Sequence, residues 1–188
     1  MNSRCYPIQI INKYYSSNPQ ARLILLDHSR MVTRKALQIC RFLQTQDESI
    51  DLRFVAEASM LHDIGMIMTD TPELGCHGKG SYLQHGIRGK EILENEGLFK
   101  HARVCERHIG VGLTSKEIEE QKLPIPARDM RPETLEEQII CYADLFYSKG
   151  GKNRNLETTP EKVRDKLAEF GSSNAKIFDQ WREKFESH

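Results

Sequence analysis

The chain has 188 residues, which is enough for one domain with a sizeable buried core. Its 27 basic residues balance its 27 acidic residues, so no net charge attracts it to nucleic acid or to an anionic membrane, and we expect neither as a partner. No apolar run approaches the roughly 20 residues of a membrane-spanning helix, and residues 1–7 lack the basic stretch and long apolar core of a secretion signal.

Helical spacing of the apolar residues accounts for most of the chain. Asn18-Pro19 predicts the start of the longest helix, because proline suits a first helical turn, and Ser115 is the expected N-cap of a short charged helix. Helices are expected at residues 6–15, 19–44, 82–96, 98–108, 115–121 and 134–148, with a further one opening at Asp51. Residues 69–81 and 122–132 are rich in glycine or proline and are expected to be loops.

The composition turns polar after Gly150-Gly151, where two more amphipathic helices are expected to begin near Pro160 and Asn174. Their apolar residues predict that they either clamp the main bundle or form a homodimer contact. No heptad is sustained and no β alternation is convincing, so we expect an all-α orthogonal helical bundle. Residues 1–150 would form the main domain, and residues 151–188 a helical appendage packed on it.

The five cysteines form no Cys-x-x-Cys pair, and their odd number argues against a disulfide framework. We therefore expect a reduced, cytoplasmic protein.

Histidines and aspartates at apolar helix positions are the most informative feature of the chain. His62 and Asp63 end one apolar run, and Asp144 lies inside another, four residues after Ile140. A single histidine on an apolar face is more often a hydrogen-bonded core residue than a metal ligand. A buried aspartate, however, has a large desolvation cost unless a cation or several donors meet it. The set therefore predicts a metal site with these ligands in chain order: His28, His62, Asp63, His85, His108 and Asp144.

The ordered pattern His…His-Asp…Asp resembles the HD superfamily of metal-dependent phosphohydrolases, and His62-Asp63-Ile64-Gly65 is its HDIG variant. The resemblance covers roughly residues 18–150 and implies the HD-domain bundle. His85 and His108 resemble the additional histidines of the two-metal branch, which includes HD-type symmetrical dinucleoside-tetraphosphate hydrolases. The likeness to compact, stand-alone HDIG proteins extends to the run 132–137. Met66 stands where HD-GYP proteins usually carry lysine, which disfavours cleavage of cyclic di-GMP.

The resemblance implies a phosphohydrolase with two divalent ions, of iron, manganese, nickel or zinc, acting on a phosphate ester or anhydride of a small molecule, with a nucleotide favoured. Asp63 would bridge the ions, and His85 and His108 would serve the second ion and catalysis with it. His28, His62 and Asp144 would complete the first site. Two alternatives stay open: a non-catalytic sensor domain that binds metal and nucleotide, and a single-metal nucleotidase in which His85 and His108 are structural.

A metal-bound phosphate also needs cations around it. Lys149 is the strongest candidate because it follows Asp144 by five residues, and Lys79 is next because its glycine-rich loop precedes His85. The other candidates are Arg88, Arg107 and Arg128. We expect His101 to be a surface residue, because Lys100 and Arg103 flank it.

Overall fold

The computed structural model describes residues 5–151, 154 and 156–186. Helices dominate these residues, which confirms the all-α fold. The α-helices are α1 (Pro7–Tyr15), α2 (Pro19–Gln44), α3 (Leu52–Leu61), α4 (His85–Asn95), α5 (Phe99–Arg107), α6 (Ser115–Glu120), α7 (Leu135–Asp144), α8 (Pro160–Glu169) and α9 (Ser172–Phe185). Within the described ranges, no helix has the length and apolar character that would let it cross a membrane.

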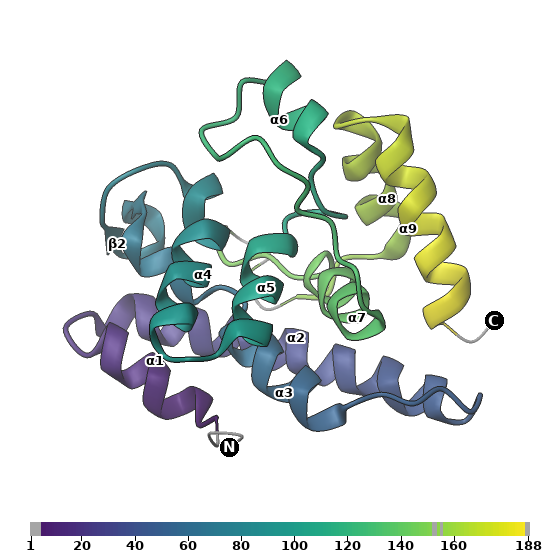
Figure 1. Cartoon of the computed structure of the whole chain (residues 1–188), viewed down its shortest axis with the longest axis horizontal. Coiled ribbons are helices and arrows are strands. Elements are labelled where there is room, and N and C mark those ends of the chain that lie inside the picture. Colours follow the sequence, from purple (N-terminus) through teal and green to yellow (C-terminus); the bar gives the residue numbers. More distant parts are fainter. Residues whose placement is uncertain (1–4, 152–153, 155, 187–188) are drawn as a thin grey trace.

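The helices surround a centre to which α2, α3, α4, α5 and α7 all contribute (Figure 1). The long helix α2 packs against α1, α3 and α7, while α4 lies beside α5. The C-terminal helices α8 and α9 pack against each other on one side of the bundle, and α9 also contacts α7 and α2. Helix α6 stands apart on a projecting segment.

Side-chain caps fix where several helices begin. The side chains of Asn18 and Asp51 accept hydrogen bonds from the backbone N–H groups that open α2 and α3, as the sequence predicts. The predicted cap of α6 is wrong by one residue. Thr114, not Ser115, is the N-cap, because Thr114 and Glu117 form a reciprocal capping box that satisfies two N–H groups at once.

The segment 69–81 is more regular than the loop we expected. It holds a two-stranded antiparallel pair, β1 (Asp70–Thr71) and β2 (Cys76–His77), together with the short 3₁₀ helix η2 (Pro72–Leu74). Two further 3₁₀ helices, η1 (Ile64–Met68) and η3 (Tyr82–Gln84), flank this segment. The pairing of so short a ladder depends on Gly75, whose φ of 76° makes the turn.

The C-terminal helices bury aromatic side chains against α7. Phe178 and Phe185 of α9 contact Tyr142 of α7, with ring centroids 5.3 and 5.4 Å apart. All three belong to the same buried apolar cluster as residues of α2 and α3. The contribution of α9 is therefore to the bundle core itself.

Two glycines allow η1, α4 and α5 to approach one another closely. A Cβ atom added to Gly65 would lie 2.1 Å from the carbonyl oxygen of His85 and 2.2 Å from the backbone nitrogen of Gly89. One added to Gly89 would lie 3.1 Å from the Cys105 side chain on α5. Real Cβ atoms essentially never lie within 3.0 Å of such neighbours, so only glycine at position 65 permits the observed backbone contact. This contact sets the spacing between the Asp63 and His85 segments.

Candidate metal centre

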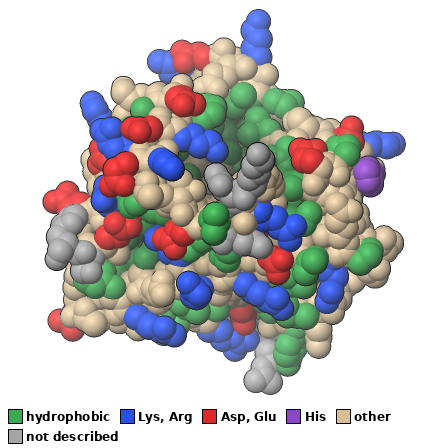
Figure 2. All heavy atoms as spheres, turned by 180° about the vertical axis from the view of Figure 1, so that it is seen from behind, with side chains coloured by type: hydrophobic (Ala, Val, Ile, Leu, Met, Phe, Trp, Pro, Cys, Tyr) green, Lys and Arg blue, Asp and Glu red, His purple; other side chains and the backbone are tan. Residues whose placement is uncertain are grey.

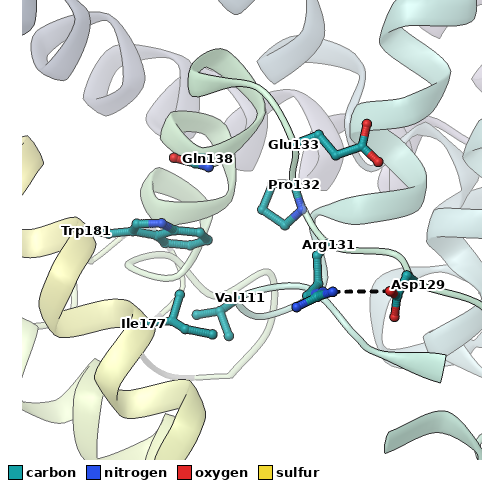
Figure 3. A pocket seen from close by; sticks show the side chains of 8 residues that line it. All are labelled: Val111, Asp129, Arg131, Pro132, Glu133, Gln138, Ile177 and Trp181. Carbon is teal, nitrogen blue, oxygen red and sulfur yellow. Dashed lines mark hydrogen bonds and ion pairs between the residues drawn. The ribbon is translucent and has the colours of Figure 1, made fainter. Parts of the chain in front are cut away.

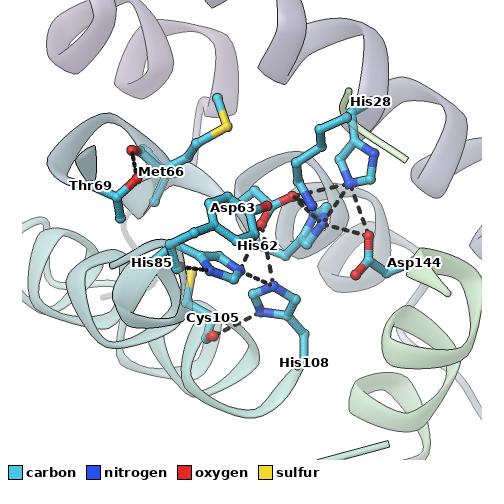
Figure 4. Close-up of polar contacts among 12 residues, drawn as sticks. His28, His62, Asp63, Met66, Thr69, His85, Cys105, His108 and Asp144 are labelled. Carbon is cyan, nitrogen blue, oxygen red and sulfur yellow. Dashed lines mark hydrogen bonds and ion pairs between the residues drawn. The ribbon is translucent and has the colours of Figure 1, made fainter. Parts of the chain in front are cut away.

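The six predicted ligands lie together in the centre of the bundle (Figure 4). They form two groups whose ligand atoms lie within 4.8 Å of one another, and Asp63 belongs to both groups. The first group is His28, His62, Asp63 and Asp144, and the second is Asp63, His85 and His108. Five of the six residues are buried, and the Asp144 side chain is 15% exposed.

The two carboxylate oxygens of Asp63 are divided between the two groups. Oδ2 lies 3.0 Å from His28 Nε2 and 2.9 Å from His62 Nε2. Oδ1 lies 3.2 Å from His85 Nε2 and 3.3 Å from His108 Nε2. Asp144 Oδ1 completes the first group, 2.9 Å from His28 Nε2. Asp63 is therefore placed to contribute one oxygen to each of two neighbouring cations.

Three of the imidazoles are oriented by the main chain. Nδ1 of His62, His85 and His108 lies 2.7, 2.6 and 2.8 Å from the carbonyl oxygen three residues earlier. Because a carbonyl can only accept, Nδ1 must carry the proton, which leaves Nε2 of a neutral ring with a lone pair. This is the tautomer that a metal-ligating histidine needs.

The Nε2 atoms face one another rather than a donor. His28 and His62 are separated by 3.2 Å at Nε2, and His85 and His108 by 2.9 Å. Oδ1 of Asp63 faces the imidazoles of His85 and His108, while Oδ2 faces those of His28 and His62 and the ammonium group of Lys149. Lone pairs and anionic oxygens this close repel unless a cation lies between them, so the donor set fits divalent metal.

Helix ends add to this negative potential. His62 and His108 are the C-cap residues of α3 and α5, and Asp144 is the last residue of α7. The C-terminus of a helix carries a partial negative charge, which favours a cation. Three such ends therefore converge where the ligands meet.

Charges in the cluster shift the pKa values of its members. Burial opposes ionisation of Asp63, but the charges of His62 and Lys149 outweigh it and hold the pKa of Asp63 well below its usual range. Burial likewise opposes the charge of His62, yet Asp63 and Asp144 raise its pKa to about 10. Burial lowers the pKa of His108. Without metal, a proton on His62 would thus partly neutralise the cluster.

Lys149 is the predicted phosphate ligand that contacts the cluster. Its Nζ lies 2.7 Å from Asp63 Oδ2, and its side chain is 12% exposed. Burial opposes its charge, but Asp63 raises the pKa of Lys149 well above its usual value.

Tyr82 was missed by the sequence analysis. Its ring stacks on the ring of His85, with centroids 4.4 Å apart, and the ring centroid lies 5.8 Å from Lys149 Nζ. Its backbone carbonyl oxygen accepts the hydrogen bond from His85 Nδ1. The sequence held one signal for Tyr82, which is its position three residues before the predicted ligand His85.

The other predicted phosphate ligands have different surroundings. Arg107 pairs with Glu133 and Glu137, at 2.9 and 3.1 Å. Arg128 pairs with Glu106, a carboxylate that also holds Lys90. Arg88 pairs with Glu91 on the surface, and Lys79 is exposed. For Arg107 and Arg128 a phosphate role would require leaving these carboxylates, so the geometry does not support it.

His101 corrects a further expectation, because it is buried, with 9% of its surface exposed. Its ring packs edge-on against Phe54 and its Nε2 lies 3.3 Å from Glu57 Oε2. The flanking charges on which the surface prediction rested lie elsewhere around the helix.

A separate cavity of about 310 Å³ lies between α7, α9 and the segment 129–133 (Figure 3). Its lining includes Val111, Arg131, Ile177 and Trp181 and none of the six cluster residues. On the face of the molecule shown in Figure 2, basic and acidic side chains are interspersed, as the balanced composition predicts.

Comparison with known proteins gives the chain a family. The HD domain family matches residues 25–148. An uncharacterized protein of Methanocaldococcus jannaschii is 35% identical over 154 residues, which cover 81% of this chain and 83% of that protein. No solved structure matches the chain.

Two further relatives are named tRNA (cytidine(56)-2'-O)-methyltransferase. The one from Picrophilus torridus is 31% identical over 159 residues, and the one from Thermoplasma volcanium is 28% identical over 160 residues. The matches cover 82% and 85% of this chain but only 42% and 40% of those relatives. The similar segment is thus less than half of each named methyltransferase.

Proposed function

The chain belongs to the HD domain family of metal-dependent phosphohydrolases, and from this premise we propose that it hydrolyses a phosphate ester or anhydride of a small molecule, a nucleotide being the class we favour. The observation that carries the proposal is the division of the two Asp63 oxygens between two sets of imidazoles. A centre with two ions is the arrangement that uses both oxygens.

The ligand roles follow from the two groups. His28, His62 and Asp144 would hold one ion, His85 and His108 the other, and Asp63 both. When bound, such ions would stabilise negative charge on phosphoryl oxygens. They would also lower the pKa of a bound water molecule, so that hydroxide is available to attack phosphorus near neutral pH. Nitrogen and oxygen ligands suit iron, manganese, nickel or zinc.

Lys149 supplies the cation that the substrate phosphate would meet beside the ions. Its ammonium group is already held at Asp63, so it needs little reorganisation to donate to a phosphoryl oxygen as negative charge builds there. Tyr82 would support this arrangement by packing on His85 and lying beside Lys149. Both residues act by orientation and charge.

The test is hydrolysis of a panel of phosphorylated metabolites by protein loaded separately with iron, manganese, nickel or zinc. We expect turnover of a nucleotide phosphate by the wild type and its loss in Asp63→Asn. Metal binding without hydrolysis of any compound would favour the sensor alternative and contradict the proposal.

Metal stoichiometry separates the two-ion centre from the single-metal nucleotidase. We expect the six-residue cluster to hold about two ions in the wild type and about one in His85→Gln and in His108→Gln, with a far larger loss in kcat than in substrate binding. One ion in all three proteins would contradict the two-ion proposal while leaving hydrolysis itself standing.

The names of the two longer relatives support a second candidate, in which the phosphate belongs to an RNA. The balanced charge of this chain disfavours it, because RNA binding is usually driven by basic surface. Electrophoretic mobility of a tRNA with increasing protein at low salt would decide: we expect no shift at concentrations where nucleotide phosphates are hydrolysed.

A further inference from the structure

A second group of metal-ligand side chains lies outside the six-residue cluster. Cys5 precedes α1, Glu57 lies on α3 and His101 lies on α5. One ligand atom of each lies within 4.8 Å of the other two. Cys5 and His101 are buried and the Glu57 side chain is 16% exposed. A thiol, an imidazole and a carboxylate from three separate segments thus converge at one place.

The distance between two of the three ligand atoms suits tetrahedral coordination. His101 Nε2 lies 3.3 Å from Glu57 Oε2. Two ligands at the bond lengths of zinc, roughly 2.0–2.1 Å, and at a tetrahedral angle are about 3.3 Å apart. The observed pair therefore need move little to share one ion.

Neighbouring side chains hold two of the ligands in place. Arg53 donates to Glu57 Oε1 at 2.7 Å, which turns Oε2 toward His101. The ring of Phe54 packs edge-on against the ring of His101, with centroids 5.1 Å apart. Supporting contacts of this kind orient metal ligands and raise affinity.

We propose that Cys5, Glu57 and His101 bind one thiophilic divalent cation of the zinc type, with a fourth position open to water. The chemistry of the donor set separates this site from the six-residue cluster, which contains nitrogen and oxygen ligands and no sulfur. Thiolate and carboxylate together balance the two charges of the ion. The proposal does not depend on the phosphohydrolase activity.

The protonation states are compatible with binding. Burial lowers the pKa of His101, which favours the neutral imidazole. Nε2 carries the proton in the hydrogen bond to Glu57, because a carboxylate can only accept, and it presents a lone pair once that proton moves to Nδ1. Burial and the charge of Glu57 raise the pKa of the Cys5 thiol to about 12, so without a cation the thiol keeps its proton. Binding releases that proton as the sulfur–metal bond forms, and affinity for the ion should rise with pH.

The site would tie the start of the chain to two helices of the metal centre. Glu57 precedes His62 by five residues on α3, and His101 precedes His108 by seven residues, two turns of α5. An ion held between them would fix α1, α3 and α5 relative to one another. The role of this ion would be structural.

Cobalt(II) titration of the full chain under reducing conditions tests the proposal. Thiolate-to-cobalt charge transfer gives a near-ultraviolet absorption that the sulfur-free six-residue cluster cannot produce. We expect this band in the wild type and in Asp63→Asn, saturating at one ion per chain and displaced by zinc. Cys5→Ser should lose the band, and His101→Gln should weaken cobalt binding at least about tenfold.

Cys40→Ala is the matched control, because Cys40 is a buried cysteine of α2 outside both groups, and it should keep the band. Circular dichroism confirms that each variant is folded. In the Asp63→Asn background, saturating zinc should raise the melting temperature, and it should not do so once Cys5→Ser is added. No band in the wild type, or a band that persists in Cys5→Ser, would overturn the proposal.

Discussion

The Asp63 carboxylate is fully buried and contacts four imidazole nitrogens, so its charge is the property to test at the level of a single residue. Asp63→Asn keeps the shape and removes the charge and one ligand oxygen. We expect the affinity for metal to fall by about 100-fold or more, while the helix content stays unchanged. Elemental analysis per folded chain measures this.

Asp129→Asn is the control for that variant, because Asp129 is an exposed carboxylate paired with Arg131. It should keep the metal content of the wild type. A full complement of metal in Asp63→Asn would show that the carboxylate does not bridge.

His62 makes the stability of the metal-free protein depend on pH. Its pKa is raised from 6.5 to about 10 in the folded state, so protonated His62 stabilises the fold fully below pH 6.5, and this contribution is lost as the pH rises through 10. We expect the melting temperature of metal-free protein to fall by at least about 3 °C between pH 7 and pH 10, which corresponds to about 1 kcal/mol for a domain of this size.

Bound metal takes the place of the proton on His62, so the metal-loaded protein should show a smaller fall over the same range. His62→Gln removes the titrating group and should also flatten the curve. Equal falls in the metal-free wild type and in His62→Gln would contradict this assignment.

At the scale of elements, the contact between η1 and α4 sets the distance from Asp63 to His85. Gly65→Ala would place a methyl group 2.1 Å from the His85 carbonyl oxygen, which is backbone and cannot turn aside. We expect a loss of about 1–3 kcal/mol in the free energy of unfolding and a lower metal content, measured by urea denaturation and elemental analysis.

Gly97→Ala serves as its comparison. Nothing lies within 4 Å of a Cβ at Gly97, so alanine there costs only the strain of its positive φ, and metal content should stay at the wild-type value. If Gly65→Ala retains both stability and full metal content, the close approach does not position the ligands.

For the whole molecule, the packing of α9 on α7 tests whether the C-terminal helices belong to the bundle. Phe178 is fully buried against Tyr142 and Phe146, so Phe178→Ala should cost about 3–5 kcal/mol. Phe170 is 60% exposed, and Phe170→Ala should change stability by no more than about 0.5 kcal/mol. Thermal unfolding of both variants gives the comparison, and equal stabilities would refute the clamp.

The sequence predicted the parts of this molecule that depend on local chemistry. Asn18-Pro19 marks the start of α2, and the six histidines and aspartates on apolar helix faces do converge. Individual contacts between segments far apart in the chain could not be predicted from local sequence patterns. The Lys149–Asp63 ion pair joins residues 86 positions apart, and the burial of His101 depends on where α3 packs.

The cap of α6 and the two short strands were missed for different reasons. Thr114 and Ser115 are both good caps, but Thr114-x-x-Glu117 has the spacing of a capping box, whereas Ile118 stands at that place for Ser115, so the sequence did hold the signal for Thr114. The β1–β2 pair has two residues per strand, which is too short for alternation to appear.

The hydrogen bonds that orient His62, His85 and His108 all end on main-chain carbonyls, three residues before each ring. His62 and His108 follow the last residues of α3 and α5, and His85 ends η3, where its own backbone N–H also donates to the Tyr82 carbonyl. Side-chain substitution cannot remove such an acceptor. The contacts that orient these three imidazoles are therefore insulated from mutation, and the side chains around them can change while the ring orientation stays fixed.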